Sequence, residues 1–141
     1  MGSDAAVGFG AFEGERYLNL ESYRRTGQGV RTPVWFAAGA SDASDGGGPV
    51  LYVYTTADSG KAKRIRRSGA VRVAPCDARG KLMGAWIDAR AEIVSGTAFA
   101  RGMRLINRKY RPWKQILDLS VLLFARHRRI MLAIRPGVAA A

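Results

Sequence analysis

The stretch VLYVYTTADSGKAKRI, residues 50–65, carries the strongest local signal in the chain. Residues 50–56 are rich in β-branched and aromatic side chains, which favour a strand. The Asp-Ser-Gly sequence at 58–60 interrupts that pattern and predicts a turn. The basic residues that follow fit a short helix over 61–67. A strand that passes through a turn into a basic helix is therefore the feature from which the rest of the fold is predicted.

Alternating apolar residues predict further strands on both sides of this stretch. We expect them at 17–23, 30–37, 70–76, 82–94 (bent near Gly84) and 129–135. Helices are expected at 97–110 and, behind Pro112, at 113–124, where the apolar residues leave almost no polar face. Because the predicted helices are few and lie mostly toward the C-terminal end of the chain, the pattern argues against a doubly wound sheet. It favours an antiparallel sandwich or barrel.

The chain has 141 residues, which predicts one domain over 1–141, with a loose N-terminal arm or a short helix at 1–15. Lys and Arg total 23 against 11 Asp and Glu, so the net charge is +12. That excess favours an anionic partner: a nucleic acid, a phosphorylated small molecule or an acidic membrane face. The basic residues are not interleaved with aromatic ones in an RNA-binding pattern, so most of them are expected to be solvated.

Several classes of chemistry are disfavoured by what the sequence contains. The single cysteine, Cys76, excludes an internal disulfide framework. The single histidine, His127, stands between two arginines, and we expect neither a metal site nor a hydrolase triad from it. The start of the chain lacks a secretory pattern, and the apolar run at 116–125 is too short to span a membrane, so a soluble cytoplasmic protein is predicted.

The turn after residue 56 is the first candidate binding site. Hydroxyls end the strand, and cations occupy the first turn of the helix, where the free N–H groups and the partial positive charge normally disfavour them. An incoming phosphate would resolve that repulsion. The predicted phosphate-binding residues are Thr55, Thr56, Ser59, Gly60, Lys61 and Lys63. The alternative is an exposed basic helix with a simple Ser or Asp cap.

The segment 31–36 (Arg-Thr-Pro-Val-Trp-Phe) is the second candidate. Proline cannot donate to a strand ladder, so Pro33 predicts an edge strand or a backbone that faces something other than a neighbouring strand. Such a strand can offer its polar groups to a flat heterocycle. The predicted ring-lining residues are Arg31, Thr32, Pro33, Val34 and Trp35. The alternative for Trp35 is an ordinary core position.

Taken together, these segments resemble the split β-barrel flavin and deazaflavin oxidoreductases related to pyridoxamine 5′-phosphate oxidase. The resemblance is carried by residues 31–36, 51–65 and 71–80, and it runs from about residue 17 to 94. It implies a mainly β fold, a six-stranded antiparallel Greek-key-like barrel with flanking helices. It also implies a homodimer with the cofactor at the subunit interface. In such proteins the strand that matches 31–36 lies along the flavin ring, and the segment that matches 55–61 holds the phosphate.

The chain departs from the oxidase pattern at two positions. Ser59 and Lys61 match the serine and lysine of the Ser-Arg-Lys motif, but Gly60 stands where the arginine would be, and Lys63 is the candidate to replace it. Phe36 stands where the oxidase has the lysine that ends its strand. These departures argue against pyridoxamine phosphate oxidation and favour the deazaflavin cofactor F-420, with FMN as the other candidate.

The resulting prediction is an oxidoreductase that transfers hydride from the cofactor to a small unsaturated or quinone-like substrate. The cofactor ring would do the chemistry, so no catalytic acid or base residue is assigned. Two alternatives remain open: a cofactor carrier or sensor without turnover, and a basic nucleic-acid-binding protein.

Overall fold

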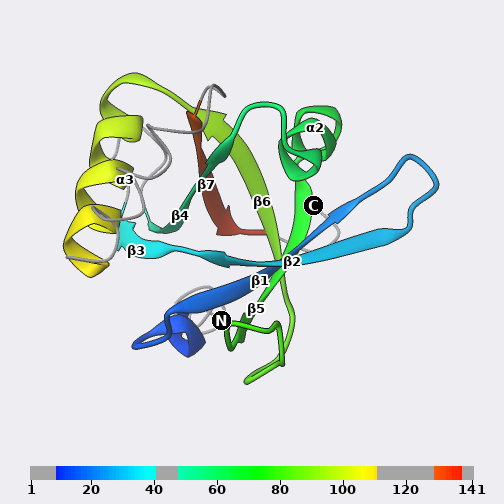
Figure 1. Cartoon of the computed structure of the whole chain (residues 1–141), viewed down its shortest axis with the longest axis horizontal. Helices are drawn as coiled ribbons and strands as arrows, with labels where there is room; N and C mark the ends of the chain where they lie inside the picture. The colour runs from blue at the N-terminus through cyan, green and yellow to red at the C-terminus, as the bar shows by residue number, and fades with distance from the viewer. Residues whose placement is uncertain (1–8, 41–47, 111–128, 138–141) are drawn as a thin grey trace.

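The computed structural model describes residues 9–40, 48–110 and 129–137. They form seven strands, two α-helices and one short 3-10 helix (Figure 1). The strands are β1 (Tyr17–Tyr23), β2 (Gly29–Trp35), β3 (Ala37–Ala40), β4 (Pro49–Thr56), β5 (Ala70–Cys76), β6 (Ile87–Val94) and β7 (Arg129–Pro136). The helices are η1 (Gly10–Phe12), α2 (Gly60–Arg67) and α3 (Gly96–Lys109).

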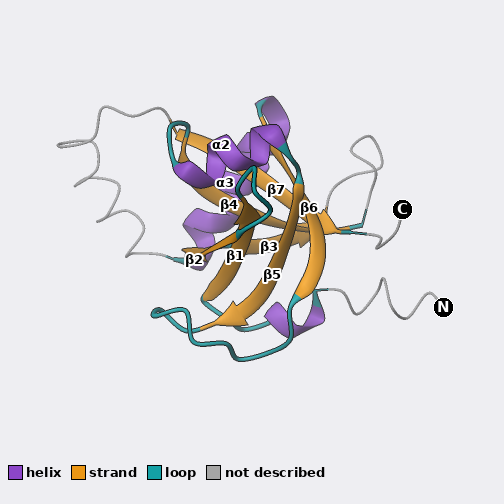
Figure 2. Cartoon of the chain, turned by 90° about the vertical axis from the view of Figure 1, so that its right-hand side faces the viewer, coloured by secondary structure: helices purple, strands orange, loops and turns teal. Residues whose placement is uncertain are grey.

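All seven strands belong to one antiparallel sheet with the order β2-β1-β5-β6-β7-β4-β3. The two edge strands, β2 and β3, are consecutive in the chain and are separated only by Phe36. The segment 29–40 therefore connects the two edges, and the sheet must curl into a barrel, as Figure 2 shows from the side. The predicted split β-barrel is confirmed, with seven strands rather than six because this segment divides at Phe36.

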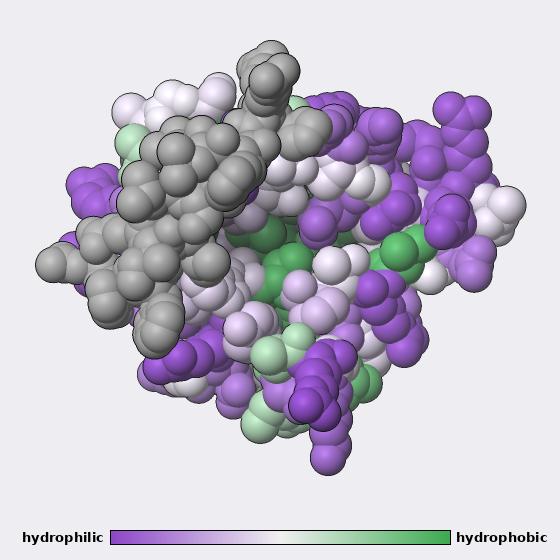
Figure 3. All heavy atoms as spheres, viewed as in Figure 1, coloured by the Kyte–Doolittle hydropathy of each residue, from purple (hydrophilic) through white to green (hydrophobic). Residues whose placement is uncertain are grey.

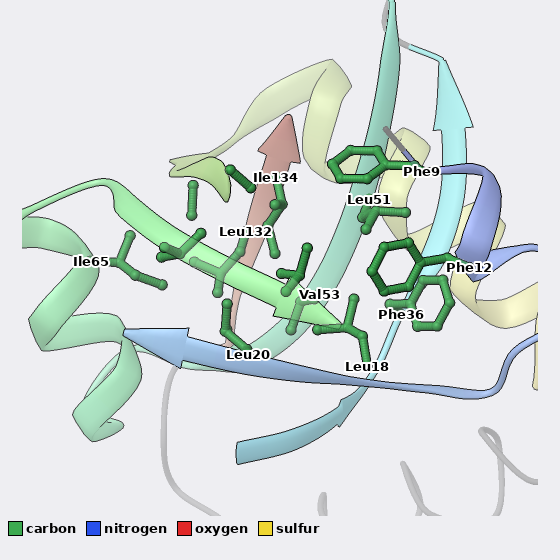
Figure 4. Close-up of a cluster of buried hydrophobic side chains, with 14 of the residues drawn as sticks. Phe9, Phe12, Leu18, Leu20, Phe36, Leu51, Val53, Ile65, Leu132 and Ile134 are labelled. Carbon is green, nitrogen blue, oxygen red and sulfur yellow. The ribbon is translucent and has the colours of Figure 1, made fainter. Parts of the chain in front are cut away.

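The interior of the barrel is an apolar cluster to which most of the strands, η1 and α2 contribute. Leu18 and Leu20 enter it from β1, while Leu51 and Val53 enter it from β4. These side chains alternate along their strands, as a period of two requires. Figure 4 shows how the large members meet: Phe9, Phe12, Leu18, Leu20, Phe36, Leu51, Val53, Ile65, Leu132 and Ile134.

A second apolar cluster lies on the outer face of β4 and β7, where α3 covers the sheet. Gly102 lets the helix come close, because a Cβ there would lie 2.9 Å from both Met131 Sδ and Tyr52 Cδ1. Ile106 and Tyr110 at the end of the helix are also buried in this cluster. Helix α3 therefore covers the half of the barrel that contains β3, away from α2 (Figure 1).

Tyr110 also secures the point where segment 29–40 changes partner. Its hydroxyl accepts a hydrogen bond from Phe36 N–H at 3.0 Å. Its single proton is shared between the carbonyl oxygens of Phe36, at 2.7 Å, and Arg16, at 2.6 Å. Both backbone polar groups of Phe36 are thus satisfied at the residue where neither strand ladder reaches them.

Two sequence-based expectations differ from the structure. The expected strand 82–94 begins only at Ile87, because residues 82–84 fold back on β5 and Met83 N–H bonds to Pro75 O at 2.8 Å. The loose arm expected at 1–15 is not seen at residues 9–12, because Phe9 and Phe12 are buried in the core and Gly10–Phe12 form η1, the short-helix alternative. The helix expected at 113–124 and His127 lie outside the described residues.

Candidate cofactor-binding site

The barrel is open between β2 and the second half of β4. Within residues 9–40, 48–110 and 129–137, strand β2 pairs only with β1, and β3 pairs only with residues 49–52 of β4. In the part of the chain that the structure describes, β4 therefore has no strand partner on this side from Val53 to Thr56. Figure 1 shows β2 and the second half of β4 diverging from each other, with α2 beyond the end of β4. Pro33 was predicted to mark such an edge, and this prediction is confirmed.

The surface on this side of the molecule is hollowed, with hydrophobic residues at its centre and polar side chains around them (Figure 3). Val34 on β2 and Ala57 after β4 are partly exposed and pack against the core. An apolar floor with polar groups at its margin is the usual character of a small-molecule site. Two other hollows, of about 420 and 320 Å³, have none of the predicted cofactor residues among the described residues that line them.

Strand β2 divides the five predicted ring-lining residues between its two faces. Thr32 and Val34 pair with Leu20 and Leu18, so they face the barrel interior. Arg31, Pro33 and Trp35 lie on the outer face. There the Trp35 ring stacks on Tyr110, with 4.3 Å between ring centroids and 4° between planes. The side chains that can reach the opening from β2 are therefore Thr32 and Val34.

Arg31 belongs to a different group of side chains. Its Nε donates to Glu21 Oε2 at 2.8 Å, and Arg72 Nε donates to Glu21 Oε1 at 2.9 Å. Both guanidinium groups lie over the Trp86 ring, at 4.7 and 5.2 Å from its centroid. Burial raises the pKa of Glu21, but the hydrogen bonds from Arg31, Arg72 and Tyr23 outweigh it and lower that pKa to about 2. We interpret this group as a structural network.

The predicted phosphate residues gather at the start of α2. Lys61 Nζ donates to Thr55 Oγ1 at 3.5 Å, which connects the first turn of the helix to the end of β4. Ser59 N–H donates to Thr56 O at 3.2 Å, so the turn between them is tight. Burial, and then the nearby Arg64, lower the pKa of Lys61. A half-buried ammonium beside a second cation, on the N-terminal turn of a helix, is an arrangement that an anion would stabilise.

Two of the predicted phosphate residues stand outside the Lys61–Thr55 contact: Ser59 caps the helix, and Lys63 is exposed. Ser59 Oγ accepts from Ala62 N–H at 3.1 Å and caps α2, as the simple-cap alternative expected. Its hydroxyl proton remains able to donate. Lys63 is exposed, and its side chain makes no hydrogen bond or ion pair within the described residues. The structure therefore brings Lys61, Ser59 and Thr55 together and leaves Lys63 apart.

Arg64 is the residue of this corner that the sequence reasoning missed. Its Nε donates to Ser22 Oγ at 2.7 Å, so α2 is connected to the end of β1. Burial lowers the pKa of Arg64, and the neighbouring Arg24 and Arg67 lower it further. The signal was present in the sequence, because Arg64 lies four residues after Gly60 and hence above it on a helix.

The described residues contain no group of three or more His, Cys, Asp or Glu side chains placed to hold a metal ion. Among their helices, none is long and apolar enough to cross a membrane.

Comparison with known proteins gives a consistent architecture. The chain matches the heme storage protein HutZ from Vibrio cholerae (TM-score 0.64, 11% identity, 90% of this chain and 85% of that one). It also matches an F-420 reductase (TM-score 0.55, 20% identity, 92% and 93%). A proposed pyridoxamine 5′-phosphate oxidase from Listeria innocua is similar too (TM-score 0.54, 13% identity, 92% and 90%). No protein-family model and no curated protein sequence matches the chain.

These likenesses establish the fold. The chain has the split β-barrel architecture found in pyridoxamine phosphate oxidase-like and F-420-dependent proteins, and the resemblance noted in the sequence is confirmed at that level. At 11–20% identity they carry no assignment of cofactor or reaction.

Proposed function

We propose that the protein is an oxidoreductase that binds a phosphorylated flavin or deazaflavin, F-420 in preference to FMN, and passes hydride to a small unsaturated or quinone-like substrate. The observation that carries this proposal is the corner formed by Thr55, Ser59 and Lys61 at the open edge between β2 and β4. A neighbour described as an F-420 reductase, which shares the architecture over 92% of the chain, supports it.

The chain offers each part of such a cofactor a suitable environment. Lys61, Thr55 and Ser59 would hold the phosphate, with backbone N–H groups of the first turn of α2. The unpaired edge of β2, with Thr32 and Val34 facing inward, would lie along the ring. The bound ring supplies the hydride chemistry, and the protein supplies orientation and excludes water. Glu21 and Cys76 have no part in this role, because one is held by three partners and the other is buried.

Substitution at the two lysines of α2 tests the phosphate assignment. Lys61→Ala should weaken binding of F-420 or FMN by about 1.5–3 kcal/mol, the contribution of a charge-assisted hydrogen bond. Lys63→Ala removes the same charge from an exposed position two residues away and should cost less than about 1 kcal/mol. Fluorescence titration of both variants measures the difference. If the two variants lose equal affinity for the cofactor, or if Lys61→Ala loses none, Lys61 does not bind the phosphate.

A cofactor carrier or sensor without turnover is the second candidate. The likeness to a heme storage protein favours it, because the same architecture there serves storage. Kinetics distinguish the two functions: an enzyme loaded with reduced cofactor oxidises it when quinones or enones are added. A carrier keeps the cofactor reduced over the same period.

We also propose a homodimer with the cofactor site completed by the second subunit. Leu82 and Met83, on the segment that folds over β5, are 42% and 60% exposed, and a second copy would cover them. Light scattering of Leu82→Asp/Met83→Asp against the wild type tests this proposal. A wild type that is monomeric at micromolar concentration would contradict it.

A further inference from the structure

The backbone conformation at residue 60 does not explain why that residue is a glycine. Its φ angle lies outside the left-handed region that favours glycine, and it is the first residue of α2, where alanine would be the better helix former. What distinguishes the position is its neighbour. A Cβ at residue 60 would lie 2.8 Å from an Arg64 terminal nitrogen and 3.5 Å from its guanidinium carbon. The Arg64 guanidinium therefore occupies the space that a side chain at residue 60 would take.

Arg64 is held in that place from the other side. Its Nε donates to the buried Ser22 hydroxyl at 2.7 Å, and it is less exposed than the other arginines of the helix, Arg66 and Arg67. Arg67 donates to Tyr23 O on the same end of β1. Both contacts place positive groups in the seam between α2 and the β1–β2 hairpin. Arg24 and Lys61 are near enough to repel Arg64 electrostatically.

We propose that Arg64 is an anion-binding residue of the phosphate corner, and that Gly60 is required because its missing side chain leaves room for the Arg64 guanidinium. The inference rests on the proposed function for the identity of the ligand. It replaces the earlier candidate, Lys63, with a residue one helical turn beyond Gly60. A guanidinium fixed through Nε keeps its terminal N–H groups in a planar fork, which suits two oxygens of one phosphate.

The first experiment compares two arginines of the same helix. Arg64→Gln should lower the affinity for F-420 or FMN about 10- to 100-fold, as expected for loss of a hydrogen-bonded charge. Arg66→Gln removes the same charge from an exposed position and should lower it less than about threefold. Equal losses in the two variants would show that only net charge matters and would overturn the proposal.

A double-mutant cycle tests the role of Gly60 directly. Gly60→Ala should lower the affinity in the wild type, because the added Cβ displaces the guanidinium. In the Arg64→Gln background the same change should have no further effect on affinity. Additive losses would mean that Gly60 acts independently of Arg64 and would overturn this part of the proposal. Ser22→Ala, which releases Nε but keeps the guanidinium, should give a smaller loss than Arg64→Gln.

Inorganic phosphate gives a measurement that does not depend on the ring. At equal ionic strength, phosphate in place of chloride should raise the melting temperature of the wild type and of Arg66→Gln but not of Arg64→Gln. Melting of each variant without phosphate checks that it is folded. If phosphate has no effect on the wild type, the inference is wrong. If phosphate binds through Arg64 but neither F-420 nor FMN binds, the inference holds and the proposed function fails.

Discussion

At the scale of single residues, Glu21 is the charge on which the outer face of β1, β2 and β5 depends. Its side chain is 5% exposed and lies between two arginines that are themselves 53% and 37% exposed. Removal of a buried charge from such a network leaves its partners to repel each other. Because those partners can still be solvated, the cost should be below that of a fully buried pair.

We expect Glu21→Gln to destabilise the fold by about 2 kcal/mol at neutral pH. The pKa of Glu21 is about 2 in the folded chain, below its ordinary 4.5. The stability that its charge contributes is therefore complete above about pH 4.5 and is lost as the pH falls through 2. Urea denaturation should show the difference between wild type and variant shrinking from pH 5 to pH 2. A difference independent of pH would contradict this assignment.

Cys76 gives a second prediction at this scale. The side chain is 1% exposed, and burial, followed by the carboxylates of Asp77 and Glu15, raises the pKa of its thiol to about 11. Since the thiolate is the reactive form, a thiol reagent at pH 8 should modify the native protein far more slowly than the urea-unfolded protein. Absorbance of the released chromophore measures both rates. Similar rates would show that Cys76 is accessible in the folded state.

Residue identities predicted the edge strand but not the arrangement of side chains around it. Pro33 predicted a strand edge without a pairing partner, and Ser59 was the alternative prediction of a simple cap for α2. Both predictions depend only on the local geometry of the backbone. Arg31 and Trp35 were expected at the cofactor ring. Their contacts with Glu21 and Tyr110 depend on strand register and on the position of α3, which no local pattern contains.

At the scale of elements, the change of partner at Phe36 depends on the end of α3. The Tyr110 hydroxyl satisfies both backbone groups of Phe36, and burial raises the pKa of that hydroxyl to about 12. Tyr110→Phe should lower stability by about 1–3 kcal/mol, because the Phe36 groups remain buried without partners. Tyr17→Phe is the matched control, since its hydroxyl has no hydrogen bond within the described ranges, and it should cost under about 0.5 kcal/mol. Equal effects in thermal unfolding would contradict this role.

Element boundaries were most accurate where the chain alternates regularly, as in β1 and β5, whose predicted and observed limits coincide. They were wrong at 82–86, where apolar residues continue the pattern of a strand. There Gly84 lies against Pro75, with 2.6 Å between a built Cβ and Pro75 Cγ, and the segment covers β5 instead of extending β6. A tertiary contact thus overrides the local preference for extended pairing.

At the scale of the whole molecule, the order of the predicted strands and helices indicated a barrel more clearly than any single predicted strand did. One segment of the chain forms both edges of the seven-stranded antiparallel sheet, so the sheet must close into a barrel. The opening beside β4 follows from the same connection, because segment 29–40 can follow only one edge strand at a time. Sequence could not give the position of that opening, since it depends on where in the segment the chain changes partner.

The net charge of +12 leads to the last prediction, which separates cofactor binding from the nucleic-acid alternative. Binding to duplex DNA through many exposed cations releases counterions, so its affinity should fall at least about 1000-fold between 50 and 200 mM salt. Cofactor binding at a half-buried corner involves one phosphate and should fall less than about tenfold over the same range. Parallel titrations of a short duplex and of F-420 measure both slopes. Tight DNA binding that persists at 200 mM salt, together with no cofactor binding, would favour the nucleic-acid function.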